Sequence, residues 1–405
     1  MLKVFGVLAA SFKQHTTPRV DNAIFRLHYR ATTVLLLASC ILVCTRQFIG
    51  NPIQCITDGK IPGHVINTYC FIMSTFTVPD YHDTEIGKES PHPGVGTPGI
   101  DGGGTEYHAY YQWVPFVLFL QAAMFYFPHY LWKIWDDGKF PTLIQGLNNK
   151  AMVMKSDDRK SKHRCLIKYV MGNLHEHNMW AFKFFFCEFL NVVNCIGNIY
   201  FTDYFLGYQF SKYGSEVLSY IQTTEIEDRT DPMDKVFPKV TKCTFHSFGP
   251  SGTIQKHDSL CVLALNIINE KIYTFLWFWF IILAVVTCLG LAYRLFIVLA
   301  PAMRYNLLKL RGRLLGDKRY LDVIIEKCQI GDWLLLYHLG RHMNGMSYGE
   351  FLQGLGEAMD RGYGTEPRAP KYDPREDTPL KPNLDPEYPV KPLQDELNAQ
   401  LRERH

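Results

Sequence analysis

The sequence predicts an all-α membrane protein with four transmembrane helices, two disulfide-linked extracellular loops and helical cytoplasmic regions. Three observations support this fold class. Hydrophobic residues make up 47% of the 405-residue chain, and many of them gather in four blocks, each close to the roughly 20 residues that a helix needs to cross a bilayer core. Lys and Arg concentrate in alternate segments between these blocks, and four cysteines fall in the two remaining loops.

The four apolar blocks give the expected membrane spans, at residues 31–49, 110–135, 179–203 and 271–299. The second block contains Pro115 and Pro128, which a membrane helix tolerates because neighbouring helices satisfy the freed carbonyls. The third contains Glu188, and the fourth is the most continuously apolar.

The basic residues predict the orientation of these spans. Lys and Arg are frequent in 1–30 and 136–178 and after the fourth apolar block, where Arg294 is counted among them, whereas 50–109 contains only Lys60 and Lys88 against a majority of acids. Short loops rich in Lys and Arg stay in the cytoplasm. Both termini and the middle loop are therefore expected inside, and the loops 50–109 and 204–270 outside. The second outer loop has more Lys than this rule favours, but long loops count weakly.

Outside the four spans, some segments are expected to be helical and others to be unstructured. Within the first outer loop, 92–104 reads HPGVGTPGIDGGG, which predicts an unstructured excursion. The cytoplasmic region 300–361 is expected to be helical over 322–326 and 332–339. From 362 to 405 Pro and charged residues dominate, which predicts a disordered tail. The segment Met1–Ser11 lacks a signal-peptide cleavage site, so the first span is expected to stay in the mature chain.

Four of the eleven cysteines lie in the predicted outer loops, namely Cys55, Cys70, Cys243 and Cys261. Because thiols are oxidised outside the cell, an even set there predicts two disulfides. Four cysteines allow three pairings, and the residues alone do not choose among them. Zinc is the competing interpretation, but no CxxC and no adjacent His pair accompanies these spacings, so no metal is expected.

A polar stripe is predicted in the third span, where Glu188, Asn191, Asn194 and Asn198 repeat at helical spacing. Polar groups are costly in a bilayer, so this face should point toward protein or water. The stripe could line a conduction path, or it could form interhelical hydrogen bonds that hold subunits together. We favour the second interpretation.

Several functional classes are excluded. A net charge of +3, spread over several segments, does not suggest a nucleic-acid partner. The pair His175 and His177 lacks the H-E-x-x-H spacing that places two imidazoles on one helix face, and the chain has no Gly-rich phosphate loop or nucleophile elbow. We therefore expect no catalytic residues, no cofactor and no enzyme activity.

Several segments resemble the innexin family. The residues Tyr110, Tyr111, Gln112, Trp113 and Val114 match the YYQWV signature that opens the second span of that family. Three longer segments are similar to the family's first span, its third span, and its second outer loop with the fourth span: Asn22–Ile56, Phe184–Leu206 and Phe237–Phe280. The resemblance covers the chain from Met1 to about Ala300.

The resemblance implies a subunit of a gap junction channel that passes ions and small molecules between adjacent cells. It implies a multi-pass protein of the plasma membrane that forms a homo-oligomer, an octamer, and docks with a second oligomer on the adjacent cell. Membrane lipid and other innexins, in heteromers, are further expected partners. It also favours bridges between the loops, Cys55 with Cys261 and Cys70 with Cys243.

The resemblance further assigns the pore mouth to the amino-terminal segment, which in the family folds into the cytoplasmic entrance, while the first span lines much of the channel. The assigned residues are Met1, Leu2, Lys3 and Phe5. Apolar residues interrupted by Lys3 suit a short amphipathic helix. By pattern alone this helix could instead lie on the bilayer surface, and the resemblance favours the pore.

Two other functions compete with the junctional channel. One is an undocked hemichannel that releases ATP or small anions. The chain has no N-x-Ser/Thr sequon, so no glycan on the outer loops would block docking, which favours the junctional form. The other is a four-pass adhesion or scaffold protein of the claudin or tetraspanin kind, but those have different cysteine spacing and lack the YYQWV segment.

Overall fold

The computed structural model describes residues 20–82, 84, 86–97, 104–145, 147, 156–222, 231–312 and 319–361. These ranges are mostly helical, as the predicted fold class requires. The predicted pore-mouth residues and the predicted disordered tail lie outside the described residues.

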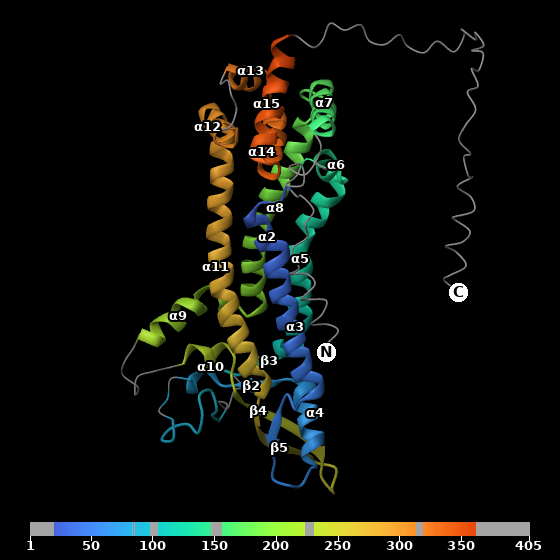
Figure 1. Ribbon diagram of the computed structural model, residues 1–405. Helices are drawn as coiled ribbons and strands as arrows, with labels where there is room; N and C mark the ends of the chain where they lie inside the picture. The colour runs from blue at the N-terminus through green and yellow to red at the C-terminus, as the bar shows by residue number, and fades with distance from the viewer. Residues whose placement is uncertain are drawn as a thin grey trace, which may run out of the picture. The chain divides into compact units, whose positions relative to one another are not determined.

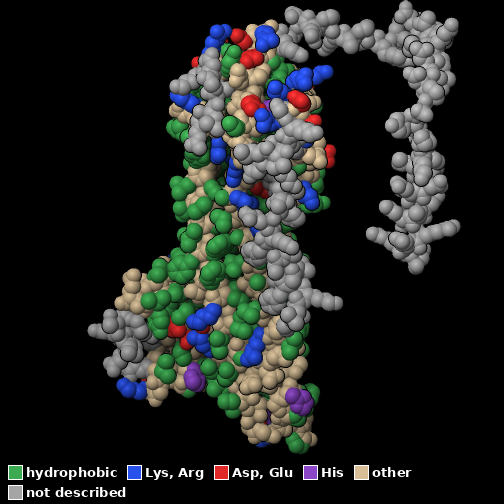
Figure 2. All heavy atoms as spheres, viewed as in Figure 1, with side chains coloured by type: hydrophobic (Ala, Val, Ile, Leu, Met, Phe, Trp, Pro, Cys, Tyr) green, Lys and Arg blue, Asp and Glu red, His purple; other side chains and the backbone are tan. Residues whose placement is uncertain are grey.

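Four helical segments of the described ranges are long and apolar enough to cross a membrane. They are the continuous helix formed by α2 (Ala23–Arg26), η1 (Leu27–Thr32) and α3 (Thr33–Ile49), then α5 (Val114–Asp136), α8 (Asn178–Phe205) and α11 (Ala264–Leu299). They pack side by side (Figure 1). On the face drawn in Figure 2, hydrophobic side chains cover these helices, whereas acidic and basic side chains gather over one end of the bundle.

The first and fourth spans begin earlier than predicted. The first begins at Ala23 because the side chain of Asn22 caps the helix, accepting a hydrogen bond from the backbone N–H of Phe25. The fourth begins at Ala264, ahead of the apolar block, and its first turns carry the buried residues Asn266 and Glu270. Local hydropathy misses such turns because their polar side chains find partners in the loops.

One end of the bundle, called here the sheet end, carries a five-stranded antiparallel sheet that the all-α prediction did not include. Its strands follow the order β1 (Gln54–Ile56), β5 (Ile254–Val262), β4 (Val240–Phe248), β2 (Thr75–Thr77) and β3 (Glu106–His108). The β4–β5 hairpin forms the centre of the sheet. The three strands from the first loop have three residues each, which is too short for an alternating pattern to reveal them.

Short helices complete the sheet end: α4 (Gly63–Met73), η2 (Pro79–Tyr81), η3 (Tyr110–Gln112), α9 (Phe210–Gln222) and α10 (Pro232–Val236). The prediction of an unstructured excursion from residue 92 is wrong for its described part, 92–97. Gly94 is hydrogen-bonded to Val78 and to Tyr81 through its backbone, and Val95 is buried. Residues 98–103 lie outside the described ranges.

The other end, called here the helical end, contains α6 (Lys139–Leu143), α7 (Ser156–Gly172), α12 (Pro301–Arg311), α13 (Arg319–Lys327), α14 (Ile330–His342) and α15 (Gly345–Asp360). The helices predicted over 322–326 and 332–339 lie within α13 and α14. Leu336, Phe351 and Leu355 are fully buried in the core of this end. A second core, which includes Tyr111, Phe237 and Tyr273, joins the sheet end to the spans.

Candidate functional site

Two disulfides join the first loop to the second at the sheet end. Cys55 in β1 is bonded to Cys261, which lies directly opposite it in β5, and Cys70 in α4 is bonded to Cys243 in β4. These are the pairs that the family resemblance implies. The bonded residues are 206 and 173 positions apart, so each bridge removes much chain entropy from the unfolded state, and each contributes about 2–4 kcal/mol.

The two disulfides are neighbours in space. The sulfur atoms of Cys55, Cys70 and Cys261 lie within 4.8 Å of one another. Zinc binds thiolates, so this group of sulfurs offers no metal site while both bridges are intact. The bridges instead fasten α4 and the sheet into one unit, and three of the four cysteines are fully buried in it, with only Cys55 partly exposed.

The YYQWV segment holds the start of α5 against α4. The hydroxyl of Tyr111 donates to the backbone oxygens of Cys70 and Phe71, at 3.4 and 3.5 Å. The side-chain amide of Gln112 donates to the oxygens of Phe71 and Ile72, at 2.6 and 3.2 Å. The last carbonyls of a helix lack partners within the helix, so these two side chains cap α4 close to its disulfide.

The other residues of this segment have different surroundings. Tyr110 packs edge-on against Phe237 of the second loop, at 5.8 Å between ring centroids. Val114 is fully buried, whereas Trp113 is 61% exposed and packs beside Phe116. The segment therefore links both loops to the second span.

Ion pairs fix the second loop to the start of α11. The Nζ atom of Lys239 lies 2.7 Å from a carboxylate oxygen of Asp234 and 3.1 Å from one of Glu270. Burial lowers the pKa of Lys239, but the bonds to Asp234 and Glu270 outweigh burial and raise it overall. The ammonium group therefore stays charged between the loop and the span.

A buried hydrogen bond of 2.7 Å joins Thr77 in β2 to His108 in β3. Burial lowers the pKa of His108 to about 4, so the folded sheet favours the neutral imidazole. An unfolded His has a pKa of about 6.5. The resulting stability is present above that value and is lost as the pH falls toward the folded pKa.

The predicted polar stripe of the third span faces the interior of the subunit. Glu188, Asn191 and Asn198 are buried. Asn198 donates to the backbone oxygen of Asn194 at 2.8 Å. Glu188 is hydrogen-bonded to Asn22 and to Arg294 of the same chain, so these bonds lie within the subunit. That the stripe holds subunits together stays a prediction.

The residue that sequence reasoning missed is Arg294. It was counted among the basic residues after the fourth apolar block, but the structure places it inside α11, where it is 9% exposed. Its Nε and Nη2 atoms donate to the two carboxylate oxygens of Glu188, each at 2.8 Å. A charge in a membrane helix needs a partner, so the presence of Glu188 was the signal that could have led to Arg294.

Comparisons with known proteins agree with this architecture. The family model described as Innexin matches residues 21–359. Innexin inx2 of Schistocerca americana is 48% identical over 360 residues, which cover 89% of this chain and 99% of that protein. Innexin inx2 of Drosophila melanogaster is 48% identical over 359 residues, covering 89% and 96%. Innexin shaking-B of Drosophila melanogaster is 40% identical over 352 residues, covering 87% and 93%.

Proposed function

The chain belongs to the innexin family, and we propose that its sheet end is the outer surface through which two channels dock. Innexins are gap junction subunits. The chain is accordingly a subunit of an intercellular channel in the plasma membrane, passing ions and small molecules between adjacent cells, and it is not an enzyme. Gap junction channels are oligomeric. The octamer, its docking and its heteromeric partners belong to the proposal.

The observation that carries the proposed orientation is the pair of disulfides at the sheet end. Disulfides persist in the oxidising environment outside the cell, whereas Lys and Arg concentrate in the segments that form the helical end. We therefore place the sheet end outside and the helical end, with both termini, in the cytoplasm. Two bridges and the capped α4 make the outer surface rigid, which lowers the entropy cost of docking.

Paired cells that express only this chain test the junctional function. Coupling, measured as current or dye transfer between the cells, is the expected result. Membrane current in single cells without coupling in pairs would favour the undocked hemichannel instead. If neither current appears although the protein is at the cell surface, the channel function itself is contradicted for this chain acting alone.

We also propose that the amino-terminal segment lines the cytoplasmic mouth of the pore, with Lys3 facing the permeation path. The support is the family resemblance and the pattern of apolar residues around Lys3. Symmetry repeats this charge once per subunit, and a ring of like charges in a narrow pore strongly biases the ions admitted.

Changing Lys3 to Glu should therefore shift selectivity toward cations with little effect on surface expression. Reversal potentials under a salt gradient measure the shift. Lys160→Glu is the control, because Lys160 is exposed on α7 at the helical end and the same charge reversal there should leave selectivity unchanged. Identical reversal potentials for wild type and Lys3→Glu would contradict the pore-mouth assignment and favour a helix on the bilayer surface.

Deleting residues 362–405 should leave assembly and conduction largely unchanged. This segment is rich in Pro and charged residues and lacks the apolar side chains that offset the entropy of ordering. Size-exclusion chromatography of the purified oligomer and junctional conductance check the prediction. A truncated chain that no longer oligomerises would show that the tail has a structural role.

A further inference from the structure

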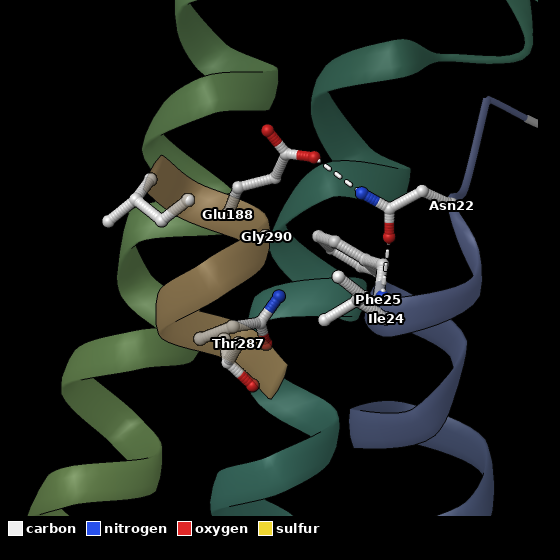
Figure 3. A pocket seen from close by; sticks show the side chains of 8 residues that line it. Asn22, Ile24, Phe25, Glu188, Thr287 and Gly290 are labelled. Atoms are coloured by element: carbon white, nitrogen blue, oxygen red, sulfur yellow. Dashed lines mark hydrogen bonds between the residues drawn. The ribbon is translucent and has the colours of Figure 1, made fainter. Parts of the chain in front are cut away.

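We propose that Asn22, Glu188 and Arg294 form a clamp that sets the position of the first turn of the first span. This inference deepens the proposed function, because it rests on the amino-terminal segment acting at the pore mouth, and Asn22 caps the helix that follows that segment. The three residues come from the start of α2, from α8 and from α11. Figure 3 shows Glu188 pointing toward Asn22.

Glu188 is the centre of the clamp. The side-chain amide of Asn22 donates to its Oε1 atom at 2.7 Å, and Arg294 donates to both of its oxygens at 2.8 Å. Oε1 thus accepts from both partners, so the start of the first span is tied directly to a charge pair between two other helices.

Glu188 and Arg294 are expected to stay paired, because both are buried and neither can easily replace the other with water. Glu188 and Arg294 are each 9% exposed. The guanidinium carbon of Arg294 lies 5.7 and 5.5 Å from the ring centroids of Phe184 and Phe185, so aromatic rings cover part of the charged group. In such surroundings an unpaired charge is costly, so Glu188 and Arg294 stay together and hold Asn22 with them.

The side-chain amide of Asn22 both caps α2 and bonds to Glu188, and it uses a different atom for each. Its Oδ1 atom accepts from the backbone N–H of Phe25 at 2.6 Å and caps α2, while its Nδ2 atom donates to Glu188. The cap and the tie to Glu188 can therefore be separated by substitution.

The turn that the clamp holds is also packed, because Phe25 is 1% exposed and stacks on Phe184 with 6.1 Å between ring centroids. A cavity of about 20 Å³ lies beside the clamp, lined among others by Ile24, Asn191 and Thr287. The Oδ1 atom of Asn191 is buried without a hydrogen-bond partner. A polar cavity of this size can admit a water molecule.

The helix after this turn is also irregular. Residues Leu27–Thr32 form the π-helical segment η1, and such segments often occur at functional sites. Within it, His28 is hydrogen-bonded to Thr287 of α11 at 2.8 Å. The turn before η1 keeps a backbone hydrogen bond from Arg26 to Asn22. Side chains add to it: Asp21 accepts from the hydroxyl of Tyr29 at 3.0 Å and lies 4.0 Å from His129. The clamp ties the same turn to the pair of Glu188 and Arg294.

The substitution Asn22→Asp separates the clamp from the cap. Aspartate keeps an oxygen for the N–H of Phe25, and it is as good a helix cap as asparagine, but it places a second carboxylate against Glu188. Backbone hydrogen exchange of the purified full-length oligomer, followed in the peptide Val20–Leu27, measures the result. We expect exchange to become at least about tenfold faster, as the loss of one hydrogen bond to a charged group predicts.

Combining Asn22→Asp with Glu188→Gln should slow exchange again relative to Asn22→Asp, because the amide of Gln can donate to the new carboxylate while its oxygen still accepts one of the two hydrogen bonds from Arg294, and the net charge equals that of wild type. Asn344→Asp is the matched control. Asn344 also caps a helix, α15, through its side-chain oxygen, and its replacement should leave the exchange of Val20–Leu27 unchanged.

The outcomes separate this inference from the proposed function. Unchanged exchange in Asn22→Asp, or equally fast exchange in the double variant, would overturn the clamp. Faster exchange that the double variant reverses supports it, and a parallel change and recovery in single-channel conductance supports the link to the pore. If the double variant reverses the faster exchange but conductance is the same in all variants, the clamp is supported and the role of the amino-terminal segment at the pore mouth is contradicted.

Discussion

Replacing Cys243 with Ser will abolish coupling between paired cells while leaving insertion of the chain into the membrane intact. The substitution removes a bridge worth about 2–4 kcal/mol, a large part of the 5–15 kcal/mol by which typical domains are stable. It also frees the thiol of Cys70, whose sulfur lies within 4.8 Å of those of Cys55 and Cys261.

The freed thiol makes this variant especially damaging. As a thiolate, Cys70 can attack one sulfur of the Cys55–Cys261 bond, forming a new disulfide and releasing the other cysteine as a thiol. The sheet would then be held by a wrong bridge. Replacing both Cys70 and Cys243 prevents this exchange, so the double variant should keep the Cys55–Cys261 bridge and retain more folded protein than Cys243→Ser.

Mass mapping of non-reduced digests, surface labelling and junctional conductance together check this prediction. Cys165→Ser is the control, since Cys165 is a free, exposed cysteine on α7 and its loss should change none of the three. Normal coupling in Cys243→Ser would show that docking does not require this bridge. Free thiols at the four loop cysteines of the wild type would remove the basis of the prediction.

The spans and the loops differ in how well the sequence predicts them. A membrane helix satisfies its backbone hydrogen bonds within one continuous segment, so its location follows from local hydropathy, and all four spans were found. The β4–β5 hairpin is local, with nine residues in each strand, but the all-α prediction did not include it. The strands of the first loop instead depend on pairing between residues far apart, such as Phe76 with Lys242. Such pairing leaves no local pattern in strands of three residues.

For the disulfides and for the clamp, the sequence indicates that a residue needs a partner but does not identify which residue that partner is. Residue types and compartment predict that Cys55, Cys70, Cys243 and Cys261 are oxidised, but the choice among pairings came from the family resemblance. Similarly, the cost of Glu188 in a bilayer predicts that a partner exists, yet hydropathy could not identify Arg294, which lies 106 residues away. In neither case do the residues alone identify the partner, because it lies far away along the chain.

Replacing Arg294 alone with Met will prevent most of the protein from assembling. Met removes the charge but keeps a long apolar chain, so Glu188 remains buried without its two charged hydrogen bonds. Breaking a buried pair from one side costs roughly 3–5 kcal/mol. We expect the variant to lose most of its oligomer in size-exclusion chromatography and to couple cells poorly.

The double variant Glu188→Leu with Arg294→Met should recover much of the lost assembly, because apolar residues of similar volume often replace a buried ion pair without loss of stability. Leu cannot accept the hydrogen bond from Asn22, so this variant should assemble and yet leave the first turn of the first span unclamped. Thermal unfolding and oligomer yield measure stability and assembly, whereas hydrogen exchange of Val20–Leu27 measures how firmly the first turn of the first span is held. If the double variant assembles no better than Arg294→Met, the loss of assembly does not come from leaving Glu188 buried without its charged partner. Recovered assembly with fast exchange would show that stability and positioning are separate contributions of the same residues.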